Sequence, residues 1–102
     1  MTRYKFYRGE AGIYGFLIEG HSGFGAEGTD IVCASVSSAA YMAANTITNI
    51  CNIPAEINIT DAKFEVTLSL EDAKQCQDIL AGLQLHLDQL QRQYPDFIQP
   101  LH

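Results

Sequence analysis

The sequence predicts an α+β fold, in which an antiparallel sheet built from two hairpins is covered by two long helices in the order β-β-α-β-β-α. Two observations support this prediction. Four short segments have the composition or the alternation of strands, and two longer segments repeat apolar residues at steps of three and four. Because the chain has 102 residues, 47% of them hydrophobic, we expect one core and a single domain over residues 1–102.

The strands are expected as two hairpins, formed by residues 3–9 with 12–19 and by residues 55–60 with 63–69. The first pair is rich in Tyr, Phe and Ile and turns at Glu10-Ala11-Gly12. The second pair alternates apolar and polar side chains, as half-buried strands do, and turns at Thr60-Asp61-Ala62. Residues 96–102 could add a short C-terminal edge strand.

Two segments are expected to be helical, residues 30–50 and the segment after Ser69. Ser69 and Asp72 have the spacing of a capping box, and Pro95 ends the second helix. Each helix has one apolar stripe, which we expect to cover the sheet. The stripes comprise Cys33, Val36, Ala40, Ala43, Ile47 and Ile50 in the first helix, and Ala73, Cys76, Leu80, Leu83, Leu87, Leu90 and Tyr94 in the second. In this position Cys76 is most simply a small core residue.

The net charge of −6 is unevenly distributed. Between Arg8 and Lys63 there is no Lys or Arg, although six acidic residues fall there. This distribution argues against direct nucleic-acid binding and favours a basic partner, although acidic charge also simply keeps small proteins soluble. The chain passes from Met1 straight into a strand pattern, and no uninterrupted apolar run approaches the ~20 residues of a membrane helix. We therefore expect a cytoplasmic protein that does not associate with membranes.

The three cysteines, Cys33, Cys51 and Cys76, are an odd number with wide spacing, which favours thiols over a disulfide framework. No Cys-x-x-Cys pair occurs, and the histidines are scattered. We therefore expect no metal site, and the sequence gives no reason to expect a cofactor.

The segment GHSGFGAEGTDIVCASVS, residues 20–37, places His21 and Cys33 at the two ends of a glycine-rich loop that opens a helix. A thiol attacks only as thiolate, and an imidazole beside a helix N-terminus favours that form. Gly23, Gly25 and Gly28 also spell the dinucleotide fingerprint G-x-G-x-x-G. The spacing from the strand is wrong for nucleotide binding, so we interpret the glycines, with Phe24, as a loop that can close over an extended substrate.

The roles of the residues around Cys33 are ambiguous from sequence. A cysteine on an apolar helical face is more often inert core than nucleophile. If Asp30 is the N-cap, however, Cys33 falls in the first turn, where the helix dipole lowers the pKa of a thiol. Asp30 could instead orient His21, and Ser37 could bond back to a helix carbonyl or line the site.

The quoted segment resembles the signature of the ribosomal-processing cysteine protease family, Prp, with departures at Ser22 and in the glycine-rich loop. The resemblance implies a small α/β homodimer that removes a short N-terminal extension from a large-subunit ribosomal protein. It implies that His21 and Cys33 are the catalytic pair, with Asp30 and Ser37 at the other matching positions of the motif, and that the cut segment carries aromatic residues.

The mechanism we expect is acyl transfer. The Cys33 thiolate attacks the scissile carbonyl, backbone N–H groups of the first helical turn, including that of Cys33, hold the oxyanion, and His21 gives a proton to the leaving amine. Two alternatives remain open: a binding module that docks on a ribosomal protein without cutting it, and a thiol redox sensor.

Overall fold

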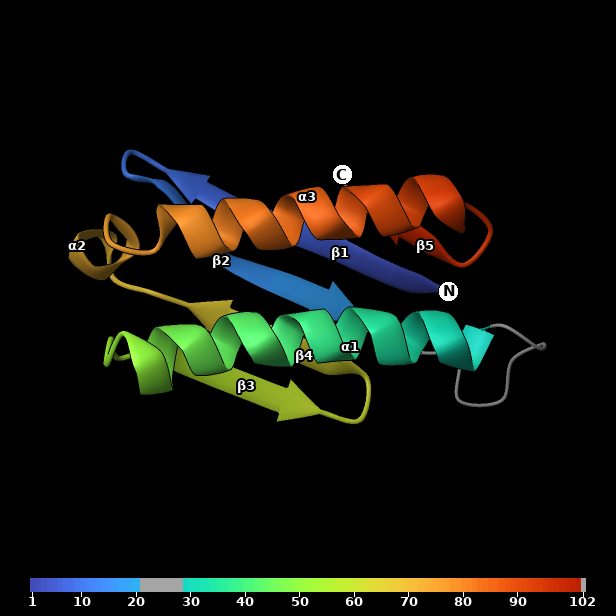
Figure 1. Cartoon of the computed structure of the whole chain (residues 1–102), viewed down its shortest axis with the longest axis horizontal. Coiled ribbons are helices and arrows are strands. Elements are labelled where there is room, and N and C mark those ends of the chain that lie inside the picture. The colour runs from blue at the N-terminus through green and yellow to red at the C-terminus, as the bar shows by residue number, and fades with distance from the viewer. Residues whose placement is uncertain (21–28, 102) are drawn as a thin grey trace.

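The structure is a computed structural model that describes residues 1–20 and 29–101, and it has the α+β architecture expected from the sequence (Figure 1). The elements in chain order are β1 (Thr2–Gly9), β2 (Gly12–Glu19), α1 (Thr29–Asn45), the π-helical turn η1 (Thr46–Ile50), β3 (Glu56–Thr60), β4 (Lys63–Thr67), α2 (Leu70–Ala73), α3 (Gln77–Gln93) and β5 (Ile98–Pro100). Both expected hairpins, β1–β2 and β3–β4, are therefore present within a residue or two of the predicted bounds.

The five strands form one sheet in the order β3-β4-β2-β1-β5. Neighbouring strands are antiparallel except β1 and β5, which pair in parallel, so the two hairpins form the expected antiparallel sheet and β5 makes the whole sheet mixed. β5 is parallel to β1 because the chain crosses back through α2 and α3 after β4. A strand that follows such a return runs in the same direction as β4, and β1 already runs that way. The C-terminal segment does form the short edge strand that the sequence left open.

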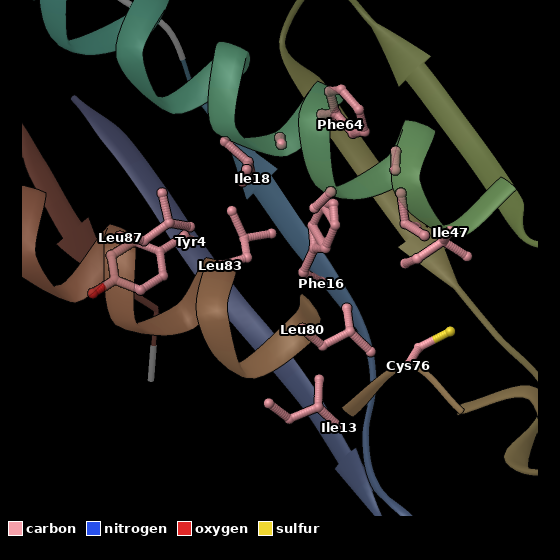
Figure 2. Packing of buried hydrophobic residues seen from close by; sticks show 14 of the residues in the cluster. Tyr4, Ile13, Phe16, Ile18, Ile47, Phe64, Cys76, Leu80, Leu83 and Leu87 are labelled. Atoms are coloured by element: carbon pink, nitrogen blue, oxygen red, sulfur yellow. The ribbon is translucent and has the colours of Figure 1, made fainter. Parts of the chain in front are cut away.

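The helices α1 and α3 lie side by side on one face of the sheet, with α3 toward β1 and α1 toward β4 (Figure 1). The core fills the space between this helical layer and the sheet. Phe16 on β2, which has no exposed surface, lies among Leu80 and Leu83 of α3 and Ile47 of η1 (Figure 2). Burial of these apolar side chains is the main driving force that holds the layers together.

The first helical stripe is buried as predicted from Val36 to Ile47, but Ile50 is 74% exposed and that part of the prediction was wrong. The reason is the π-helical turn, in which the Cys51 N–H donates to the Thr46 carbonyl five residues earlier. The wider turn rotates Ile50 away from the sheet. In the described part of the chain, residues 31–50 also form one helical segment long and apolar enough to span a membrane. Of its most apolar window, 33% is buried inside the molecule.

The second helical segment is interrupted, whereas the sequence predicted one helix. Ser69 caps α2, because its Oγ accepts the Asp72 N–H at 3.2 Å, as the capping box predicts. The chain then breaks before Gln77, whose side-chain amide donates to the carbonyls of Ala73 and Ile13, each at 2.7 Å. The Ala73 carbonyl would accept the Gln77 backbone N–H in a continuous helix, so the side chain replaces that bond and fastens α3 to β2. Ala73, Cys76, Leu80, Leu83 and Leu87 are nevertheless buried.

Candidate active site

Cys33 lies at the edge of the buried stripe of α1, between the sheet and the surface. Its neighbours Val32 and Val36 are each 1% exposed, whereas Cys33 is half-buried. The Cys33 Sγ is 3.4 Å from Oγ1 of Thr2, the first residue of β1, so the two side chains are within hydrogen-bonding distance. Unlike a core cysteine, Cys33 also borders a cavity.

That cavity has a volume of about 150 Å³ and lies between the start of α1 and the nearby end of the sheet. Ile18 and Phe64, from adjacent strands β2 and β4, contribute apolar side chains to it. Tyr41 of α1 packs edge-on against Phe64, with ring centroids 4.8 Å apart. The lining residues are Thr2, Ile18, Gly20, Cys33, Val36, Ser37, Tyr41, Ile59 and Thr60 to Phe64. A thiol therefore opens onto a pocket with an apolar floor and a polar rim.

Ser37, one turn after Cys33, lines the same cavity. Of the two roles that the sequence left open for Ser37, its position agrees with lining the site. The serine that bonds back to a helix carbonyl is Ser35, whose Oγ donates to the Ile31 oxygen at 2.9 Å.

Gly20 brings the end of β2 to the cavity. Its N–H donates to the Ala62 carbonyl at 2.9 Å, so the turn between β3 and β4 is fastened to the strand end. Gly20 has a φ of +74°, in the left-handed region that glycine adopts without strain. His21 is the next residue, and it lies outside the described residues, as do Gly23, Phe24, Gly25 and Gly28. Gly20, before the glycine-rich segment, and Cys33, after it, therefore both line the cavity.

The expectation that Asp30 is the N-cap was wrong, because the residue before it, Thr29, is already part of α1. Thr29 lies four residues before Cys33, and in an α-helix the Cys33 N–H is directed at the Thr29 carbonyl. The free N–H groups of this helix end belong to the residues before Cys33. The backbone of Asp30 is helical, and the orientation of its carboxylate toward His21 stays a prediction.

The charged groups on the rim of the cavity come from the turn between β3 and β4 and from the first residue of β4. Asp61 and Lys63 both line the cavity. The Lys63 ammonium lies 3.7 Å from the Glu65 carboxylate, whereas Asp61 forms no ion pair with any other residue in the described ranges. The rim therefore presents one carboxylate that could meet a cation on a bound chain. Within residues 1–20 and 29–101, no cluster of three or more acidic, histidine or cysteine side chains is arranged to hold a metal ion.

Cys76 is the core residue that the sequence predicted. It is 2% exposed, and burial raises the pKa of its thiol, with smaller contributions in the same direction from Cys51 and Asp72. Such a thiol is kept neutral and is a poor nucleophile. Cys51 is exposed on the surface and is absent from the lining of the cavity that Cys33 borders.

Sequence reasoning did not single out several residues of the cavity, above all Thr2 and Tyr41. Thr2 belongs to a different part of the chain, and only the strand order brings it beneath α1. Tyr41 could have been found, because it follows Cys33 and Ser37 at helical spacing. The α+β fold and the cavity-lining thiol together fit the class of small enzymes that use a cysteine nucleophile.

Comparison with known proteins identifies the family within that class. The model of the family described as cysteine protease Prp matches residues 1–99, and the chain belongs to this family of cysteine proteases. A curated relative from Bacillus subtilis, named ribosomal processing cysteine protease Prp, is 26% identical over 93 residues, which cover 85% of this chain and 83% of the relative.

Solved structures share the fold of this chain. A crystal structure of an essential ribosomal processing protease Prp from S. aureus, in complex with a substrate peptide, superposes with a TM-score of 0.87 at 22% identity, covering 99% of this chain and 98% of that one. Another S. aureus Prp structure, with a covalently linked product peptide, has a TM-score of 0.83 at 23% identity, covering 98% and 97%.

Proposed function

We propose that this chain is an endopeptidase that removes a short N-terminal extension from a large-subunit ribosomal protein. The observation that carries the proposal is that Cys33 borders a cavity at the end of the sheet in a chain of the cysteine protease Prp family. The names of the B. subtilis and S. aureus relatives support the ribosomal substrate. A cytoplasmic location, expected from the sequence pattern, and a homodimeric assembly, which the family resemblance implies, are also part of the proposal.

The proposed reaction is acyl transfer. His21 accepts the thiol proton, and the Cys33 Sγ forms a bond to the scissile carbonyl carbon. Backbone N–H groups at the start of α1, before Cys33, stabilise the oxyanion. His21 then gives the proton to the leaving amine as the C–N bond breaks, and water hydrolyses the thioester. The S. aureus Prp with a covalently linked product peptide is consistent with covalent catalysis of this kind.

The charge of the molecule supports a basic substrate. The chain carries a net charge of −6 and has no Lys or Arg between Arg8 and Lys63. Asp61 adds a carboxylate to the rim of the cavity. Ribosomal proteins are rich in Lys and Arg, so attraction between opposite charges would favour their encounter with this surface.

Family membership argues against a binding module without catalytic activity. No contact in the described residues favours a redox sensor, so we carry neither alternative further.

The test is to incubate the protein with a peptide that spans the extension and the mature N-terminus of the ribosomal protein, and to follow cleavage by mass spectrometry. Cys33→Ala and His21→Ala should abolish cleavage while the protein stays folded by circular dichroism. Cys51→Ala is the matched control, because it removes an exposed thiol away from the cavity, and it should cleave at the wild-type rate. Undiminished cleavage by Cys33→Ala would overturn the proposal.

A further inference from the structure

Thr2 is the one polar residue among those the structure describes that is almost completely buried. It is 2% exposed, in a core that otherwise consists of apolar residues and tyrosine. A buried hydroxyl is costly unless it forms a hydrogen bond. The partner within reach is the Sγ of Cys33, 3.4 Å from Oγ1.

The sheet holds Thr2 firmly in this position. Its N–H donates to the Phe97 carbonyl at 3.0 Å, and its Cα pairs with Ile98 of β5. Because side chains alternate along a strand, Thr2 projects to the same face as the core residue Tyr4, which is the face covered by the helices. The hydroxyl is therefore presented to α1 by a rigid element.

The direction of this hydrogen bond depends on the state of the sulfur. With a neutral thiol, either group can donate. A thiolate can only accept, so the Thr2 hydroxyl must then be the donor, and a hydrogen bond to an ionised acceptor is stronger than one between neutral groups. The contact thus favours the thiolate over the thiol and also fixes the position of the sulfur.

We propose that Thr2 is a positioning residue for the nucleophile, which donates a hydrogen bond to the Cys33 thiolate and holds its sulfur at the mouth of the cavity. This inference rests on the proposed role of Cys33 in the reaction. It assigns to the second residue of the chain a role in a site whose sequence motif begins some twenty residues later.

Other ionisable groups near Cys33 must be considered in a pH experiment. On the cavity these are Tyr41 from α1, Asp61 from the turn between β3 and β4, and Lys63 at the start of β4. His21 and Asp30 belong to the same sequence motif as Cys33, and the α-amino group of Met1 precedes Thr2, the first residue of β1. None of these groups changes when only Thr2 is substituted, so a difference between Thr2 variants isolates the hydroxyl.

The experiment measures the rate of iodoacetamide labelling of each cysteine against pH, with the labelled peptides resolved by mass spectrometry. Thr2→Val removes the hydroxyl and keeps the shape of the side chain, whereas Thr2→Ser keeps the hydroxyl. The exposed Cys51 is an internal reference in every sample. The same variants are assayed for peptide cleavage, and thermal melts check their folding. If Thr2→Val does not fold, Thr2→Ala removes the hydroxyl with a smaller side chain.

We expect the labelling midpoint of Cys33 to rise by about half to one pH unit in Thr2→Val. Labelling below the midpoint then slows by about 3- to 10-fold, the size expected for loss of one hydrogen bond to a charged group. The plateau at high pH should not fall, and kcat should decrease with little change in KM. Thr2→Ser should restore both, and Cys51 should label alike in all variants.

An unchanged Cys33 profile in Thr2→Val, or in Thr2→Ala where that variant replaces it, would overturn the role of Thr2. A lower plateau with an unchanged midpoint would also overturn it, because that pattern indicates a disturbed structure. These outcomes are distinct from failure of the proposed function, which would appear as cleavage that survives Cys33→Ala.

Discussion

Gly20→Ala tests whether the close approach of two chain segments beside the cavity is required. Gly20 has a φ of +74°, and an alanine Cβ at this position would lie 2.5 Å from the Met1 carbonyl oxygen. The left-handed conformation costs an L-residue about 1–2 kcal/mol. The Met1 oxygen belongs to the backbone and cannot rotate away as a side chain would, so the contact adds roughly 1 kcal/mol for a small backbone shift.

We therefore expect a loss of about 2–3 kcal/mol in the free energy of unfolding, which for a chain of this size lowers Tm by roughly 8–24 °C. The loss of activity should be larger than the unfolded fraction explains. Met1 precedes Thr2, and Gly20 precedes His21, so any shift that relieves the contact displaces a residue next to Cys33 or the proposed base. Misplacement by about 1 Å can cost up to about 100-fold in rate, so we expect kcat/KM to fall about 10- to 100-fold.

The assay is peptide cleavage at a temperature where both proteins are folded, with Tm from circular dichroism. Gly82→Ala is the matched control, because Gly82 lies within α3 and a Cβ there has no atom within 4 Å. That variant should gain about 0.5–1 kcal/mol from helix propensity and cleave as the wild type does. If Gly20→Ala retains both wild-type Tm and wild-type kcat/KM, the backbone approach has no importance for the site.

Three further changes test other contacts. Asp61→Asn should raise KM about 2- to 5-fold for a peptide with Lys beside the scissile bond, as expected for loss of an exposed ion pair. The KM for a Lys-free peptide should not change. Equal effects on the two peptides would show that Asp61 does not recognise the charge of the substrate. Gln77→Leu should lower the free energy of unfolding by about 2–4 kcal/mol, because the Gln77 side chain forms hydrogen bonds with both the N–H and the carbonyl of Ile13. Urea denaturation measures this change, and an unchanged urea midpoint would contradict the prediction. Burial, followed by the hydrogen bond to Glu65, raises the pKa of Tyr7 to about 12, so its contribution to stability is present below pH 10 and is lost as the pH rises toward 12. The Tm of Tyr7→Phe should therefore fall less steeply over that range than the wild-type Tm, and parallel curves would refute the assignment.

Local sequence patterns were sufficient to predict the strands and the hairpins. Alternation over two residues identified β3 and β4, and the turns fell where small and polar residues cluster. The exceptions come from contacts between distant segments. The break before α3 depends on Gln77 reaching Ile13 of β2, and nothing in the sequence near Gln77 indicates that partner. The direction of β5 likewise depends on the path of the whole chain.

The site was predictable to the extent that it lies in one segment. The motif pointed to Cys33, and helical spacing placed Ser37 beside it on the cavity. The N-cap was predicted too late in the chain, because Asp30 is a common capping residue but Thr29 already has helical backbone. Thr2 could not be found in this way, since its contact with Cys33 joins residues 31 positions apart through the sheet.

The contrast between Cys33 and Cys76 shows how the fold can set the chemistry of one residue type. Both residues fall on an apolar stripe predicted from the sequence, and from sequence alone each could be core. Cys76 lies where the stripe is covered on all sides, and burial raises the pKa of its thiol. Cys33 lies where the stripe runs past the edge of the core, so its sulfur meets a cavity on one side and the Thr2 hydroxyl on the other. A thiolate is tolerated only where a donor or solvent can stabilise its charge, and of these two thiols Cys33 has that environment.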